Sequence, residues 1–181
     1  FAKSTNLKMT LVIGGENIEE VDDILKTLID KLSTVPRKKN CINPPESPLL
    51  ITENIKFLPV TDHSGHQLAV DTFLVEHIET DWALYPDHVV FLGTYANRYE
   101  RYELLCSELS NGAHIPELIF LRGIGVFAKP EFSVAKLTQL CCYYDVLCRQ
   151  NEESILNTLY QEQVAELLNW DAEQYRMSMV K

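Results

Sequence analysis

Apolar positions along this chain fall into short runs that alternate with segments of helical spacing. The first run, residues 7–13, ends at two glycines, and apolar residues then recur every three or four positions over residues 18–32. Asn17 precedes this segment, and Glu19 and Glu20 lie in its first turn, where an N-cap and acidic side chains stabilise a helix. The pattern predicts a strand followed by a helix whose apolar face packs against a sheet.

The remainder of the chain continues the alternation of strand-like and helix-like segments. The expected elements are two strand pieces around Glu53-Asn54 within residues 49–60, a helix at 68–78, a strand at 85–94, a helix at 97–109, a glycine-interrupted strand region at 117–127, a helix at 134–147 capped by Ser133, and short helices at 153–168 and from Asp171. This order predicts an α/β fold, with a layered sheet, mixed or mostly parallel, and flanking helices.

A polar tract at residues 36–48 separates the first strand and helix from the rest. It contains four prolines and the basic run Arg37-Lys38-Lys39, a composition that indicates a linker. A basic run in a loop could bind phosphate, although such runs are usually solvated. We therefore expect a terminal strand–helix piece at residues 1–35, a linker at 36–48 and an α/β domain at 49–181.

Composition and charge exclude several classes of partner. The 181 residues are 46% hydrophobic and 23% charged, with a formal net charge of −10. Nucleic acids and anionic membranes bind basic surfaces, so neither is expected as a partner. No apolar run has the length of a membrane span and the first residues lack a signal-peptide pattern, so we expect a cytoplasmic protein. The five cysteines form no Cys-x-x-Cys pair, and reduced thiols are a better interpretation than disulfides or a metal site.

His63 and His66, with an adjacent aspartate, form the first candidate site. Two histidines and a carboxylate could ligate zinc, but a third ligand such as His77 or His88 would be needed. The serine and glycine between the two histidines are typical of a polar turn instead. We assign no metal ligand here and leave open whether the two histidines bind a metal.

Asp87 and His88 lie at the start of the predicted strand at 85–94. A carboxylate beside an imidazole could orient a general base or hold a hydroxyl-bearing ligand. Alternatively, Asp87 caps backbone donors and His88 is a structural residue at the sheet edge. Both residues belong to the candidate set.

Arg122, Gly123 and Gly125 follow the next apolar run, and Lys129 lies shortly before a predicted helix. Glycines allow a ligand to approach the backbone, and a helix N-terminus with nearby cations binds anions. The spacing also matches a loose Gly-x-Gly-x-x-Ala dinucleotide motif, but Pro130 intervenes and the expected acidic partner is missing. A phosphate or carboxylate pocket is the better prediction.

Four stretches occur in a recognisable order along the chain. They are Leu-Lys-Met-Thr-Leu-Val-Ile-Gly-Gly-Glu-Asn-Ile-Glu-Glu at residues 7–20, Pro-Asp-His-Val at 86–89, Gly-Ile-Gly-Val-Phe at 123–127 and Trp-Asp-Ala-Glu-Gln at 170–174. The first resembles the end of a class II aldolase/adducin domain. The others resemble the segments that follow that domain in larger members of the family, including the aldolase half of bifunctional aldolase/short-chain dehydrogenase proteins.

The resemblance implies a zinc enzyme that cleaves or forms a carbon–carbon bond in a sugar phosphate, with the metal polarising the carbonyl. It also places Met9 where the family has a zinc-binding histidine, and a thioether is a poor zinc ligand. We therefore expect the C-terminal part of a class II aldolase-like protein that is not a complete catalyst alone and whose cofactor is unknown. If the protein is an enzyme, the resemblance implies an aldolase-type lyase with an upstream catalytic half. The candidate residues for binding a small anionic substrate are Asp87, His88, Arg122, Gly123, Gly125 and Lys129.

The alternative is a non-catalytic interaction or assembly domain that has lost the zinc site. The aldolase/adducin fold also occurs in proteins without catalytic activity, since one fold can serve different functions. Aromatic residues in the predicted helices suit an interface, and we expect a homo-oligomer.

Overall fold

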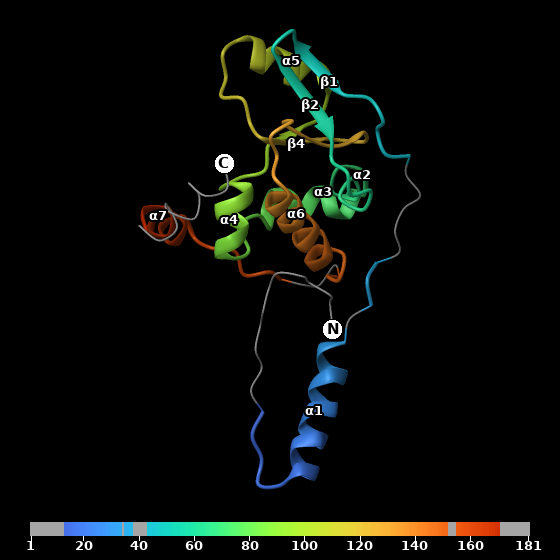
Figure 1. The fold of residues 1–181 in the computed structure, drawn as a ribbon, viewed down its shortest axis with the longest axis vertical. Helices are drawn as coiled ribbons and strands as arrows, with labels where there is room; N and C mark the ends of the chain where they lie inside the picture. Colours follow the sequence, from blue (N-terminus) through green and yellow to red (C-terminus); the bar gives the residue numbers. More distant parts are fainter. Residues whose placement is uncertain (1–12, 34, 38–42, 152–154, 171–181) are drawn as a thin grey trace.

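The structure is a computed structural model that describes residues 13–33, 35–37, 43–151 and 155–170. Met9, residues 7–12 of the first predicted strand, and the segment from Asp171 lie outside these ranges. The helices are α1 (Ile18–Leu32), α2 (Gln67–Val70), α3 (Thr72–Thr80), α4 (Pro86–Leu92), α5 (Tyr102–Ser110), α6 (Val134–Leu147) and α7 (Gln161–Asn169). The strands are β1 (Leu49–Thr52), β2 (Ile55–Pro59), β3 (Arg98–Tyr99), β4 (Leu118–Leu121) and β5 (Gly125–Ala128) (Figure 1).

The strands of the described ranges form one curled mixed sheet in the order β1-β2-β5-β4-β3. β1 with β2, β2 with β5 and β5 with β4 are antiparallel pairs, while β3 and β4 are parallel. The predicted α/β class and mixed sheet are confirmed, and the alternative of a mostly parallel sheet is wrong. Two residues join β1 to β2 and three join β4 to β5, and connections this short only allow antiparallel neighbours.

Both faces of the central strands β4 and β5 are buried, because their side chains alternate between two apolar clusters. Phe120 and Val126 join the larger cluster, together with residues of α2, α3, α4 and α6. Ile119 and Phe127 join the smaller cluster, together with residues of α5. Burial on both sides explains why the sequences of these strands are apolar without interruption.

Residues 85–94 contain helix α4 and not the predicted strand. Tyr85 has an extended backbone, Pro86 occupies the start of the helix and Asp87 lies in its first turn, which are features that favour a helix start. Gly93 ends the helix with a φ of 91°. An apolar run this short fits either element by its periodicity alone.

Other predicted elements are confirmed in kind and shifted at their ends. The two strand pieces in 49–60 are β1 and β2, the helix at 68–78 is α2 with α3, and the helix after Ser133 is α6. The predicted helix at 97–109 begins late, because its first residues form β3. The region 117–127 is a hairpin of β4 and β5, and residues 153–168 are helical only in α7 among those described.

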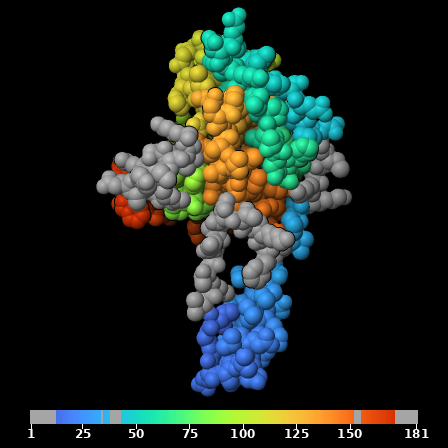
Figure 2. Space-filling model, in the orientation of Figure 1, coloured from blue at the N-terminus to red at the C-terminus, as the bar shows by residue number. Residues whose placement is uncertain are grey.

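Helix α1 forms as predicted, and the Asn17 side chain accepts a hydrogen bond from the Glu20 N–H at 2.9 Å. The prediction that its apolar face packs on the sheet is wrong, since α1 has no buried residue. Leu25, Ile29 and Leu32 are 38%, 44% and 68% exposed. Figures 1 and 2 show the helix apart from the sheet and the helices around it. Amphipathic spacing therefore predicts the helix correctly without identifying what covers its apolar face.

Candidate functional site

A hollow of about 760 Å³ lies between the end of α3, the loop that follows α4, and α7. Small-molecule sites in proteins commonly occupy roughly 300–1,000 Å³, so the hollow has the size of a ligand site. Its apolar lining comes mainly from α3, α7 and the segment after α3. The polar side chains that line it are those of Glu79, Thr80, Thr94, Tyr95, Arg98 and Gln161.

Arg98 supplies the positive charge of this hollow. Its Nη2 atom lies 3.0 Å from Oε2 of Glu79 and 3.3 Å from Oε1 of Glu100. Glu100 also accepts a hydrogen bond from Nη1 of Arg122 at 3.2 Å, so two arginines share this carboxylate. The Arg98 side chain is 23% exposed, against 65% for Glu79 and 45% for Glu100. Arg98 is therefore the best-packed member of this cluster.

Trp82 fixes the loop that carries Thr94 and Tyr95. Its indole Nε1 donates a hydrogen bond to the Gly93 carbonyl at 2.9 Å. Its ring packs edge-on against Phe120, with 5.7 Å between the ring centroids, and the residue is buried. Trp82 thus forms an apolar wall of the hollow while its polar atom holds the loop in place.

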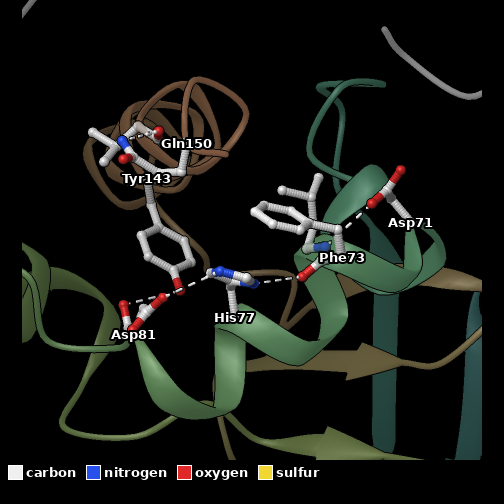
Figure 3. Close-up of polar contacts among 8 residues, drawn as sticks. Asp71, Phe73, His77, Asp81, Tyr143 and Gln150 are labelled. Carbon is white, nitrogen blue, oxygen red and sulfur yellow. Dashed lines mark hydrogen bonds and ion pairs between the residues drawn. The ribbon is translucent and has the colours of Figure 1, made fainter. Parts of the chain in front are cut away.

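Polar contacts fix the end of α3, which carries Glu79, to α6 (Figure 3). Tyr143 of α6 donates its hydroxyl to the Asp81 carbonyl at 3.2 Å, and the Asp81 carboxylate lies 3.8 Å from Nε2 of His77. Nδ1 of His77 donates to the Phe73 carbonyl at 2.9 Å. Burial raises the pKa of Tyr143, so its hydroxyl remains a proton donor. The end of α3, which forms this side of the hollow, is consequently bound to α6 by the Tyr143 hydrogen bond.

Helix α7 forms the opposite wall. The Leu159 N–H donates to the Ala83 carbonyl at 2.9 Å, and Val164 and Leu168 pack against the larger apolar cluster. No residue of α7 is buried. The hollow therefore has one wall in the core and one wall of partly buried side chains that pack against the core from outside.

Asp87 and His88, predicted as binding residues, lie on α4 and not at a strand entrance. The His88 ring packs edge-on against Trp82, Tyr85 and Tyr143, with centroid distances of 4.3, 5.6 and 4.6 Å. His88 is 0% exposed, and neither ring nitrogen has a hydrogen-bond partner among the described residues. Burial lowers the pKa of His88 to about 3, so the ring is neutral. A ligand could reach it only by displacing aromatic side chains.

Arg122 and Gly123 lie in the exposed turn of the β4–β5 hairpin, and Gly125 begins β5. Gly123 has a φ of 74°, and its N–H donates to the Ala69 carbonyl at 2.8 Å. A Cβ on Gly125 would lie 2.8 Å from Nδ1 of His66. The hairpin thus accounts for both glycines, Gly123 by its positive φ and Gly125 by the close approach of His66. The turn joins two strands and is not the strand-to-helix turn of a dinucleotide motif.

Lys129 lies just after β5, away from the hairpin turn. Its Nζ donates to the Ile115 carbonyl at 3.0 Å, and it lines a separate hollow of about 280 Å³ together with Lys56. The structure therefore does not gather the six predicted binding residues in one pocket. Of the six, Arg122 is connected to the hollow indirectly, because Glu100 forms ion pairs both with Arg122 and with Arg98, which lines the hollow. The binding roles of all six stay predictions.

The segment from Asp62 to His66 is a polar turn. Oδ1 of Asp62 accepts hydrogen bonds from two backbone N–H groups at 2.7 and 3.2 Å. His66 is buried, its Nε2 donates to the Val60 carbonyl and its Nδ1 accepts from the Val126 N–H, both at 3.0 Å. His63 is exposed. Among the described residues, no three His, Cys, Asp or Glu side chains are arranged to hold a metal ion.

The cysteines that the structure describes form no disulfide with one another, and Cys41 lies outside the described ranges. Burial raises the pKa of the Cys141 thiol to about 12. Its reactivity as a thiolate is accordingly low at neutral pH.

Glu79 and Arg98 are not among the residues predicted from the sequence. They belong to different elements, α3 and β3, and no motif connects them. The nearest signal is the stretch 85–94, whose last residue, Thr94, lines the hollow. A charged residue in an amphipathic segment indicates only a solvated face. The pairing of Glu79 with Arg98 therefore could not be predicted from the sequence.

No helix within the described ranges is both long enough and apolar enough to span a membrane. The predicted partners and the cytoplasmic location stay predictions. Comparison of the chain with protein-family models, curated proteins and solved structures gives no match, so the resemblance to class II aldolases rests on the sequence motifs alone.

Proposed function

We propose that this chain is the C-terminal part of a class II aldolase-like protein and binds a small phosphorylated sugar or a related anion in the hollow between α3 and α7. The observation that supports this most is the place of Arg98, whose side chain lines the hollow beside hydroxyl and amide groups. A guanidinium group binds phosphate or carboxylate oxygens through parallel hydrogen bonds. Thr94, Tyr95 and Gln161 supply donors and acceptors for sugar hydroxyl groups.

The existing ion pairs of Arg98 leave it able to bind an anion. Its carboxylate partners are 65% and 45% exposed, and exposed ion pairs contribute only about 0–1 kcal/mol. Trp82 and Leu168 line the hollow with apolar surface that can contact the carbon skeleton of a ligand.

We assign ligand binding, and no catalytic step, to this hollow. The resemblance implies zinc chemistry, but it places Met9 at a zinc-histidine position, and the described residues contain no arrangement that fits a metal. The substrate would therefore be held here while metal chemistry, in a complete enzyme of this kind, would need other residues.

Titration calorimetry with a panel of triose and hexose phosphates tests the proposal. We expect Arg98→Gln to weaken binding roughly 10- to 100-fold, because hydrogen bonds to charged groups contribute about 1.5–3 kcal/mol. Arg98→Lys keeps the charge without the planar fork and should give an intermediate result.

Arg101→Gln is the matched control, since Arg101 is exposed, carries the same charge and does not line the hollow. It should change the affinity by less than about twofold, because exposed charges are screened by salt. Equal weakening by Arg98→Gln and Arg101→Gln, or no binding to the wild-type protein, would contradict the proposal. Thermal melts establish that each variant is folded.

The exposed face of α1 favours assembly as a second function. Ile18, Val21, Leu25, Leu28 and Leu32 recur at intervals of three and four residues, the spacing of a coiled-coil seam. Ile18, Leu25 and Leu32 are 79%, 38% and 68% exposed. We infer that α1 pairs with α1 of a second copy, which would give the expected homo-oligomer.

Sedimentation velocity over a range of concentrations tests this pairing. Leu25→Glu with Leu32→Glu should shift the protein from dimer to monomer, because a charge in an apolar seam is strongly unfavourable. Thr27→Glu adds a charge at an exposed position of the same helix and should leave the dimer intact. A wild-type protein that is monomeric at every concentration would rule out this function for α1.

A further inference from the structure

Two carboxylates contact the same guanidinium nitrogen of Arg98, Nη2, at 3.0 and 3.3 Å, but only one of them belongs to a residue that lines the hollow. Glu79 lines the hollow, as Arg98 does. Glu100 is not a lining residue, and its carboxylate is shared with Arg122 at 3.2 Å. An anion that enters the hollow and approaches Arg98 therefore meets Glu79, while Glu100 can keep both of its arginines.

Glu79 is also the more easily displaced of the two carboxylates. Its side chain is 65% exposed, and its only described ion pair is with Arg98 at 3.0 Å. It lies in the last turn of α3 (Thr72–Thr80), where the helix dipole disfavours a negative charge. The end of α3 is held by the hydrogen bond from the Tyr143 hydroxyl to the Asp81 carbonyl, so the Glu79 side chain can turn toward solvent without moving the helix.

We propose that Glu79 is an internal competitor for Arg98, a carboxylate that an anionic ligand must displace from the hollow. The inference rests on the proposed function of this hollow. It adds that competition by Glu79 limits the affinity of the hollow for anions. Free inorganic phosphate gains contacts mainly with Arg98, so displacement of Glu79 offsets much of its binding. A phosphorylated sugar also contacts Thr94, Tyr95 and the apolar wall and can displace Glu79 at a lower concentration.

Titration of inorganic phosphate into the wild-type protein, Glu79→Gln, Glu76→Gln and Arg98→Gln tests the inference. We expect Glu79→Gln to bind phosphate about threefold to tenfold more tightly, since a competing ion pair and one repelling charge are removed together. Glu76 is exposed on the same helix and does not line the hollow. Glu76→Gln removes the same charge and should change the affinity by less than about twofold at physiological salt.

The outcomes separate this inference from the function on which it rests. Tighter binding by Glu79→Gln that disappears in the double variant with Arg98→Gln supports it. If Arg98→Gln weakens binding while Glu79→Gln equals the wild-type protein or Glu76→Gln, the competitor role is wrong and the proposed function stands. If no variant binds inorganic phosphate, the competitor role is wrong, and the titration with sugar phosphates decides the proposed function. If Arg98→Gln also leaves the affinity for sugar phosphates unchanged, both are wrong.

Discussion

His88 is a polar side chain in an aromatic environment, with Trp82 and Tyr143 packed edge-on against its ring. An N–H group directed at an aromatic ring makes a weak hydrogen bond and replaces a conventional partner only in part. Protonation would put a second proton and a charge into this apolar surrounding. Burial is therefore the cause of the low pKa of about 3.

Lowering the pH should destabilise the protein partly through His88. An unfolded histidine has a pKa of about 6.5, and folded His88 has a pKa of about 3. Protons thus bind the unfolded state first, and stabilisation present above about pH 6.5 is lost as the pH falls toward 3. His88→Phe should reduce the loss of unfolding free energy between about pH 7 and pH 4.5 by on the order of 2 kcal/mol.

Urea denaturation at several pH values measures this effect. His114 is exposed, and His114→Gln should keep the pH profile of the wild-type protein. If the unfolding free energies of His88→Phe and the wild-type protein fall in parallel as the pH is lowered, the prediction is wrong, because protonation of His88 then does not destabilise the folded state.

The two glycines of the hairpin should differ in their tolerance of a side chain. A Cβ on Gly125 would lie 2.8 Å from Nδ1 of His66 and 2.9 Å from two atoms of Pro45, whereas one on Gly123 would meet no atom within 4 Å. Gly125→Ala should destabilise by about 2–4 kcal/mol through overpacking and strain. Gly123→Ala, at a φ of 74°, should cost about 1–2 kcal/mol, the strain of a left-handed residue.

Chemical denaturation of the two variants gives both free energies of unfolding. An equal cost at the two positions would mean that the segment containing Pro45 moves away without resistance.

Helices α1 and α6 have similar lengths and different roles in stability. Leu140 of α6 is 0% exposed, and Leu25 of α1 is 38% exposed in a helix with no buried residue. Leu140→Ala should destabilise by about 2–5 kcal/mol, the usual effect of a cavity in a core. Leu25→Ala should change the unfolding free energy of the monomer by less than about 1 kcal/mol.

Denaturation at low protein concentration, where α1 pairing does not contribute, measures both variants. A large effect of Leu25→Ala under these conditions would show that α1 packs against the body of its own chain.

Stability should be unevenly distributed over the whole molecule. β4 and β5 are buried along their entire length, and α6 contributes Leu140, Tyr143 and Leu147 to the larger cluster. Helix α7 packs against the larger cluster only through partly buried side chains and has no buried residue. Native-state hydrogen exchange should therefore show the amides of α7 opening at much lower free energy than those of β4, β5 and α6.

Such opening would give a ligand access to the hollow by movement of the α7 wall, while the wall at Trp82 stays in place. Equal protection of α7 and α6 would instead indicate that both belong to one cooperative unit.

Local signals in the sequence determined several elements of this protein. Asn17 and Ser133 accept hydrogen bonds from N–H groups three residues further on, and such caps depend only on neighbouring residues. Glu53-Asn54 and the glycines at 123 and 125 likewise place the two hairpin turns. The polar turn at Asp62 has the same local origin, because its carboxylate binds the backbone that follows it.

Only the tertiary structure decided the features on which the functional proposals rest. Whether an apolar run becomes α4 or a strand, and whether the face of α1 is covered, depends on what packs against it. The burial of His88 and the pairing of Glu79 with Arg98 join residues of different elements, and no spacing along the chain encodes such contacts. The hydrophobic effect is not directional, so an apolar or charged pattern states which side chains need partners, and the packed fold determines which partners they have.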